Sequence, residues 1–288
     1  MAITTCTLPA FLPPWCVHFL VTNDDGVDSS FLKEFIHALL AAGHRLSVVA
    51  PKHEQSWIGA AKSRHRPVHA ISADRGFGCP TWIVDGTPSD CINIALGHLL
   101  MNPFVSNKEC AESANTRIDG VLSGINIGMN ASLGFVIASG TIAGAWEGAL
   151  HGLPSIAFSP DLTGELFVRG GVANGALEPP LLDLVKTSAQ HAARLAPELI
   201  ARTPARSFIV HNVNFPLRCR ADTAVRQTVP ARVVVPGLFG PAADDGTHRL
   251  VFRLGDDLSP SAPLTDRTAL SEGFISHSVL DYTRLGVV

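Results

Sequence analysis

The sequence of 288 residues is poor in charged side chains, which make up 16% of it. It holds 22 Lys and Arg against 25 Asp and Glu, so the formal net charge is −3. Binding to the phosphate backbone of nucleic acids needs a basic surplus, so this balance excludes a dedicated nucleic-acid binder. Any anionic ligand must therefore be held by something other than bulk positive charge.

The chain also lacks long apolar runs and paired cysteines. No stretch approaches the roughly 20 uninterrupted apolar residues of a membrane span, so we expect no membrane partner. The apolar start has no positively charged segment and is interrupted by Pro9, Pro13 and Pro14, which argues against a signal peptide. The six cysteines form no C-x-x-C pair, so neither a disulfide framework nor a zinc site is expected. We expect a cytoplasmic protein with reduced thiols.

Three common catalytic motifs are absent: the P-loop, the G-x-G-x-x-G fingerprint and the G-x-S-x-G nucleophile elbow. Their absence argues against P-loop nucleotide hydrolysis, dinucleotide redox chemistry and α/β-hydrolase acyl transfer.

What the sequence does contain is an alternation of strand-like apolar runs and helical periodicities. Strands are predicted at 17–22, 45–50, 82–84, 118–122, 155–158 and from 208, and helices over 31–40, from Thr87, over 139–151 and within 179–200. This alternation predicts a three-layer, doubly wound α/β fold with a mostly parallel sheet.

The character of the chain changes toward its C-terminus. We predict an N-terminal extension (1–15), an α/β catalytic core (16–220), and a β-arm with a C-terminal segment (221–288) that packs on the core or on a partner subunit. The arm is expected to hold strands at 231–235 and 248–254, because edge strands often serve oligomer contacts.

Polar clusters follow four of the predicted strands, at 23–26, 51–56, 85–90 and 123–130. In an open parallel sheet, ligands bind beyond the carboxyl ends of the strands, near the point where the strand order reverses. We therefore expect these four loops to converge on one cleft.

Asp24 and Asp25 stand together at the mouth of a buried strand. Two like charges are costly there unless a cation compensates them, although a solvated turn explains the pair equally well on position alone. Carboxylate, hydroxyl and amide oxygens favour Mg²⁺, Mn²⁺ or Ca²⁺ over zinc.

Ser139, Gly140 and Thr141 begin a helix whose N-terminus is a candidate phosphate site. A plain Ser N-cap is the simpler interpretation of these residues in isolation. We expect Glu147 to serve packing or capping rather than catalysis. We expect His151 to lie at the end of the helix.

Taken together, the motifs resemble the SurE family of metal-dependent nucleotidases. The resemblance rests on Thr22–Gly26, Val49–Pro51 with Ser56, Gly86–Cys91, Ser123–Asn126 with Gly128 and Asn130, Ser139–Thr141 with Glu147–Gly148, Asn212–Pro216, Thr265–Asp266 and Glu272–Ser276. These motifs span about residues 17–280 in the family's order, which is far more specific than any one of them.

The resemblance implies a Rossmann-like core, a β-rich arm that mediates homodimers or homotetramers, and one divalent cation per subunit, Mg²⁺ or Mn²⁺. It implies that Asp24, Asp25, Ser56 and Asn126 hold the cation, with Asp24 and Asp25 also catalytic. It further implies that Asn130 and Ser139, Gly140 and Thr141 hold the substrate phosphate.

The sequence departs from the family pattern in four places. Trp57–Ser63 is less polar than is common, Ala138 stands where an aromatic residue is frequent, 102–116 is longer, and the N-terminal extension is extra. None of these departures touches a proposed metal ligand.

The activity implied is hydrolysis of nucleoside 5′- or 3′-monophosphates to nucleoside and phosphate. The alternatives are a non-catalytic nucleotide-binding oligomeric module and a broad-specificity acid phosphatase or exopolyphosphatase. A nucleotide-sugar transferase fits poorly, because the C-terminal third is too short and too strand-rich for a second Rossmann half.

Overall fold

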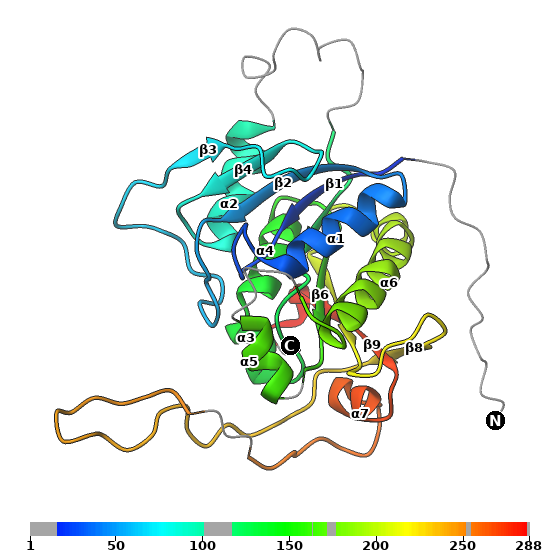
Figure 1. Ribbon diagram of the computed structural model, residues 1–288. Helices are drawn as coiled ribbons and strands as arrows, with labels where there is room; N and C mark the ends of the chain where they lie inside the picture. Colours follow the sequence, from blue (N-terminus) through cyan, green and yellow to red (C-terminus); the bar gives the residue numbers. More distant parts are fainter. Residues whose placement is uncertain (1–15, 101–116, 163, 172–176, 252–254, 287–288) are drawn as a thin grey trace, which may run out of the picture.

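The computed structural model describes residues 16–100, 117–162, 164–171, 177–251 and 255–286 (Figure 1). The predictions for 1–15 and 102–116 lie outside them. The strands are β1 (His18–Thr22), β2 (Arg45–Pro51), β3 (Ala70–Ser72), β4 (Thr81–Val84), β5 (Gly120–Ser123), β6 (Ser155–Pro160), β7 (Ile209–Phe215), β8 (Val225–Thr228) and β9 (Ile275–Asp281). The helices are α1 (Ser30–Ala41), α2 (Pro88–Ile94) continued by a π-helical turn (Ala95–Leu99), α3 (Leu133–Ala138), α4 (Gly140–Leu150), α5 (Gly164–Gly171), α6 (Leu181–Arg202), α7 (Asp266–Ser271) and a 3₁₀ turn (Tyr282–Arg284).

All of these strands form one sheet in the order β3-β4-β2-β1-β5-β6-β7-β9-β8. From β4 to β7 every neighbouring pair is parallel, whereas β3 and β9 run antiparallel to β4 and β7. Numbered along the chain, the six parallel strands have the order 3-2-1-4-5-6 of a doubly wound Rossmann sheet. The strand order therefore reverses between β1 and β5.

Helices cover both faces of the sheet, as Figure 1 shows: α1 packs beside α6, and α2 packs beside α4. Strand β1 serves both layers, because its Phe19 and Val21 belong to the core cluster that includes α1 and α6, and Leu20 to the cluster that includes α2. The α/β three-layer prediction is thereby confirmed.

The start of α2 follows from its sequence. The Thr87 hydroxyl accepts a hydrogen bond from the Asp90 amide (3.1 Å), and the Asp90 carboxylate accepts one from the Thr87 amide (2.9 Å), with Pro88 in the first turn. This reciprocal capping box fixes where the chain leaves β4 and enters the helix, whose start at Thr87 the sequence predicts.

The strands predicted at 231–235 and 248–254 are not regular strands in the described part of the arm. Isolated bridges between Val233 and Asp257 and between Phe239 and Leu250 stand in their place, and 252–254 lies outside the described residues. Two paired segments that have no further strand beside them and no packed face are only marginally stable as a β-ladder. The sequence analysis missed β8 and β9, which extend the main sheet, while the described residues 236–250 project from the body (Figure 1).

Two histidines join β7 to β9. His211 Nδ1 lies 2.8 Å from His277 Nε2, and His211 Nε2 lies 2.6 Å from the Thr203 hydroxyl, which donates to the Leu199 carbonyl. That hydroxyl has a single proton, so His211 donates from Nε2 and accepts from His277 at Nδ1. Burial lowers the pKa of each histidine to about 4, and His277 adds to the effect on His211.

We predict that this pair makes stability depend on pH. Between about pH 6.5 and pH 4 these histidines are protonated in the unfolded chain but remain neutral in the folded protein. The free energy of unfolding therefore falls as the pH falls, by up to roughly 3 kcal/mol per histidine. Urea unfolding at pH 7, 5.5 and 4.5 measures the effect in the wild type and in His277→Gln. An equal pH dependence in the two proteins would show that the His211–His277 pair is not its source.

Candidate functional site

The reversal of strand order brings two loops together. Thr22, the last residue of β1, pairs with Ser123, the last residue of β5, and the Gly124 amide donates to the Thr22 carbonyl (2.8 Å). The segments that follow, Asn23–Asp25 and Gly124–Asn126, therefore leave the sheet side by side. This is the position at which doubly wound sheets bind ligands.

Asp24 lies against the N-terminus of α4. It is 3% exposed, and its Oδ1 accepts a hydrogen bond from the Thr141 hydroxyl (2.5 Å), while the Thr141 amide also hydrogen-bonds the carboxylate. A Cβ atom at Gly140 would stand 2.8 Å from Asp24 Cβ and 3.0 Å from the Gln55 carbonyl oxygen. Glycine is therefore required at the first position of α4 for Asp24 to approach the helix.

The adjacent carboxyl of Asp25 is fixed by the second loop, because its Oδ2 accepts a hydrogen bond from the Ile127 amide (3.0 Å). Burial raises the pKa of Asp24 to about 6 and the pKa of Asp25 well above its usual range. The charges that act on these pKa values are acidic: Glu54 on both, and Asp24 on Asp25. A buried carboxyl at Asp24 and a half-buried one at Asp25, both with acidic neighbours, are a donor set that a divalent cation would stabilise.

The other two proposed ligands approach from the flanking loops. Asn126 is 8% exposed, and its side-chain amide donates to the Gly128 carbonyl (2.6 Å), which leaves its oxygen as an acceptor. Ser56 is exposed, and its neighbour Gln55 donates its amide to the Asp24 carbonyl (2.7 Å). Within the described residues no three His, Cys, Asp or Glu side chains form a metal-binding group, so a cation here depends on these neutral oxygens.

The proposed phosphate residues do not all share one set of contacts. Thr141 is engaged with Asp24, and the Ser139 hydroxyl caps α4 by accepting from the Ile142 amide (3.0 Å). The contacts of Asn130 run instead to β6 and β7. Ser139 thus acts as the N-cap that its sequence predicted, and Gly140 is the link between the helix and the carboxylates.

Asn130 is held by a buried group of polar side chains whose role the sequence analysis did not assign. The Asn214 oxygen accepts from the Asn130 amide (2.8 Å), Asn212 Nδ2 donates to the Asn130 carbonyl (2.8 Å), and Asn130 Nδ2 donates to the Ser159 hydroxyl (2.9 Å). Asn212 and Asn214 alternate along β7 and so share one face of the sheet. The sequence signal that could have indicated this group is the pair of asparagines at positions 212 and 214, which are two positions apart in a predicted strand.

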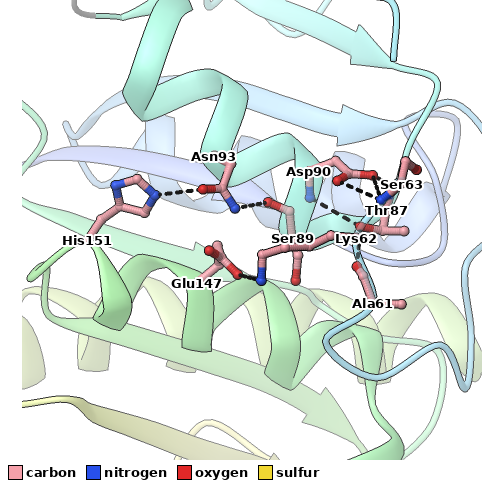
Figure 2. A network of polar contacts seen from close by, with 9 residues as sticks. All are labelled: Ala61, Lys62, Ser63, Thr87, Ser89, Asp90, Asn93, Glu147 and His151. Atoms are coloured by element: carbon pink, nitrogen blue, oxygen red, sulfur yellow. Dashed lines mark hydrogen bonds and ion pairs between the residues drawn. The ribbon is translucent and has the colours of Figure 1, made fainter. Parts of the chain in front are cut away.

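The loop after β2 is fixed at its far end (Figure 2). Within Ala61–Ser63, Lys62 Nζ lies 2.7 Å from the carboxylate of buried Glu147 in α4, and the Ser63 amide donates to Asp90 (3.1 Å) in α2. Glu147 therefore packs and pairs, as its position suggested. His151, at the end of α4, contacts the Asn93 side-chain oxygen (3.0 Å).

Comparison with known proteins finds one matching family model and several similar relatives. The family model described as "Survival protein SurE" matches residues 19–234. The 5′-nucleotidase SurE of Nostoc sp. is 39% identical over 142 residues, 49% of this chain and 48% of that protein. The 5′-nucleotidase SurE 1 of Thermus thermophilus is 42% identical over 165 residues, 56% of this chain and 58% of that protein. The aligned part of the chain thus spans about half the length of these curated relatives.

A solved structure supports the fold over a longer range. The crystal structure of the SurE protein from Aquifex aeolicus matches with a TM-score of 0.65 and 25% identity, and covers 92% of this chain and 93% of that one. Among the described residues, the helices include none that is both long and apolar enough to cross a membrane.

The asparagine group leads to a stability prediction. Asn214→Ala leaves the buried amide of Asn130 without its acceptor, which should lower the free energy of unfolding by about 1–3 kcal/mol. Urea unfolding measures the change, and Asn93→Ala, which removes a half-buried asparagine in α2, is the control. A stability loss no larger than that of the control would show that the Asn130 amide does not depend on Asn214.

A second prediction concerns metal binding without reference to activity. At 100 times its dissociation constant, a cation bound only by the folded state adds about 2.7 kcal/mol, which should raise the melting temperature by about 5 °C or more. Asp85, a half-exposed carboxylate that pairs with Arg66, provides the control. Thermal unfolding with Mn²⁺ or Mg²⁺ should show this rise in the wild type and in Asp85→Asn, and lose it in Asp25→Asn. A rise retained in Asp25→Asn would rule out this carboxylate as a ligand.

Proposed function

Because this chain belongs to the survival protein SurE family, we propose that it hydrolyses the phosphate monoester of nucleoside 5′- or 3′-monophosphates to nucleoside and phosphate. The relatives named above are 5′-nucleotidases, which supports a nucleotidase of this kind. We further propose Mg²⁺ or Mn²⁺ as the cation, assembly into a homodimer or homotetramer through the arm, and a division between core and arm near residue 220.

The observation that carries the proposal is the contact between Asp24 and the start of α4 at the strand reversal. It puts a carboxylate pair suited to a cation beside a helix N-terminus suited to a phosphate. No Lys or Arg lies between Ile118 and Val168, so this stretch offers its phosphate site without basic side chains.

The residues of the site would divide the work. A bound divalent cation supplies polarisation of a phosphoryl oxygen and a lower pKa for a bound water. Asp24 and Asp25 would hold the cation with Ser56 and Asn126, and one of the two carboxylates would orient the attacking water. The Thr141 hydroxyl donates to Asp24 and so keeps that carboxylate in one orientation.

Neutral hydrogen-bond donors would stabilise the negative charge on the phosphoryl oxygens. Gly140 offers a backbone N–H at the first turn of α4, and Asn130 Nδ2 has a second proton besides the one given to Ser159. Fixed donors of this kind stabilise developing negative charge without reorganising during the reaction. Asn212 and Asn214 keep Asn130 in place.

Hydrolysis of AMP tests the proposal. Asp24→Asn should lower kcat/KM by at least about a hundredfold with saturating Mn²⁺, because it removes one charge from the cation site and weakens the link to α4. Asp85→Asn, a surface carboxylate at the end of β4, should retain wild-type activity, and EDTA should abolish activity in both. Phosphate release from 5′-AMP and 3′-AMP is the measurement.

Wild-type turnover in Asp24→Asn would refute the assignment of this site. Binding of AMP without hydrolysis under any metal would favour a non-catalytic nucleotide-binding module. Equal hydrolysis of AMP, p-nitrophenyl phosphate and polyphosphate would favour a broad-specificity phosphatase or exopolyphosphatase.

A further inference from the structure

Two aromatic side chains lie together beside the candidate site. Trp57, in the loop after β2, and Phe135, in α3, have ring centroids 5.4 Å apart with planes inclined by 60°. Trp57 is 39% exposed, whereas Phe135 is half-buried. Trp57 therefore presents aromatic surface to solvent while Phe135 supports it from the protein side.

The loop that carries Trp57 borders the carboxylates. Trp57 directly follows Ser56, a proposed metal ligand, and consecutive Cα atoms are about 3.8 Å apart. The Gly59 amide donates to the Ala138 carbonyl (2.9 Å), which precedes Ser139 and the N-terminus of α4. Trp57 is thus the chain neighbour of a candidate cation ligand, on a loop joined to the start of the candidate phosphate helix.

The backbone holds Trp57 in an unusual conformation. Its φ of 61° lies in the left-handed region, which is disfavoured for a bulky side chain. Such a conformation persists only where the surroundings fix it. Here Gln55 is bonded to Asp24 on one side, and Gly59 to Ala138 and Lys62 to Glu147 on the other (Figure 2).

The chemistry of the ring identifies its ligand. Every nucleobase has a π-face, and bases stack on aromatic side chains without needing charged partners. A stacking surface suits this site, where 118–168 contains no Lys or Arg to select a nucleotide by charge.

We propose that Trp57, supported by Phe135, is the surface on which the nucleobase of the substrate stacks, and that it selects nucleoside monophosphates over phosphate monoesters without a base. This inference rests on the proposed nucleotidase function. Because stacking tolerates any base, Trp57 confers preference for a nucleoside without strong choice among bases.

The kinetic test compares AMP with ribose 5-phosphate, which lacks the base. Trp57→Leu should lower kcat/KM for AMP about tenfold and leave ribose 5-phosphate nearly unchanged, because only the stacking contact is lost. Trp57→Phe, which keeps an aromatic face, should retain most of the selectivity. Ile137→Ala, an exposed apolar side chain of α3, is the matched control and should leave the ratio unchanged.

An equal loss on both substrates in Trp57→Leu would show that Trp57 merely maintains the loop, and would overturn the proposal. No change on either substrate would overturn it as well. Circular dichroism checks that each variant is folded. If Trp57→Leu is not folded, the selectivity of Trp57→Phe keeps the test decisive.

A binding measurement separates this inference from the proposed function. If the wild-type protein hydrolyses neither compound with any divalent metal, the nucleotidase proposal fails, and AMP binding then tests the stacking surface alone. Calorimetric titration of AMP with EDTA present should give a dissociation constant about tenfold higher in Trp57→Leu than in the wild type. Equal dissociation constants, or AMP binding no tighter than ribose 5-phosphate in the wild type, would overturn the stacking role.

Discussion

The contact between Asp24 and the N-terminus of α4 is the constraint on which the site depends. Parallel register ends β1 and β5 together, and the missing side chain of Gly140 lets α4 approach the carboxylate to van der Waals distance. The Thr141 hydroxyl then fixes one oxygen of Asp24, and the Ile127 amide fixes one of Asp25. The result is one buried and one half-buried carboxylate, each hydrogen-bonded to neutral groups, an arrangement that is costly without a compensating cation.

The scarcity of charge around this contact has a consequence for phosphate recognition. Basic side chains would compete for Asp24 and Asp25 and would neutralise them without a metal. The hydrogen bonds to these two carboxylates come from amides and a hydroxyl, and Lys62, in the loop after β2, pairs with Glu147 of α4 (Figure 2). In the proposed site, cation binding would fall to the carboxylates and phosphate binding to the neutral donors.

Loops from both sides of the strand reversal complete the site, and they differ in how they are held. The loop after β5 leads into Asn130, which the buried asparagines of β7 clamp within the core. The loop after β2 stays at the surface and is tied at Gln55, Gly59 and Lys62, and these ties leave Trp57 exposed. A rigid side at Asn130, proposed to hold the phosphate, and an aromatic side at Trp57 would suit a ligand with one polar end and one flat apolar end.

The sequence by itself determined the α/β class, the main elements, the helix start at Thr87 and the family, because hydrophobic periodicity, caps and contiguous motifs are local properties. It also singled out Asp24 and Asp25 as a candidate cation pair, with a solvated turn as an equal alternative on position alone. Only the tertiary structure decided that Thr141 contacts Asp24, that Asn212 and Asn214 support Asn130, and that Trp57 rests on Phe135, because these partners are far apart in sequence. It likewise reduced the two predicted arm strands to isolated bridges and added β8 and β9 to the sheet, since strand pairing depends on partners that a single segment does not specify.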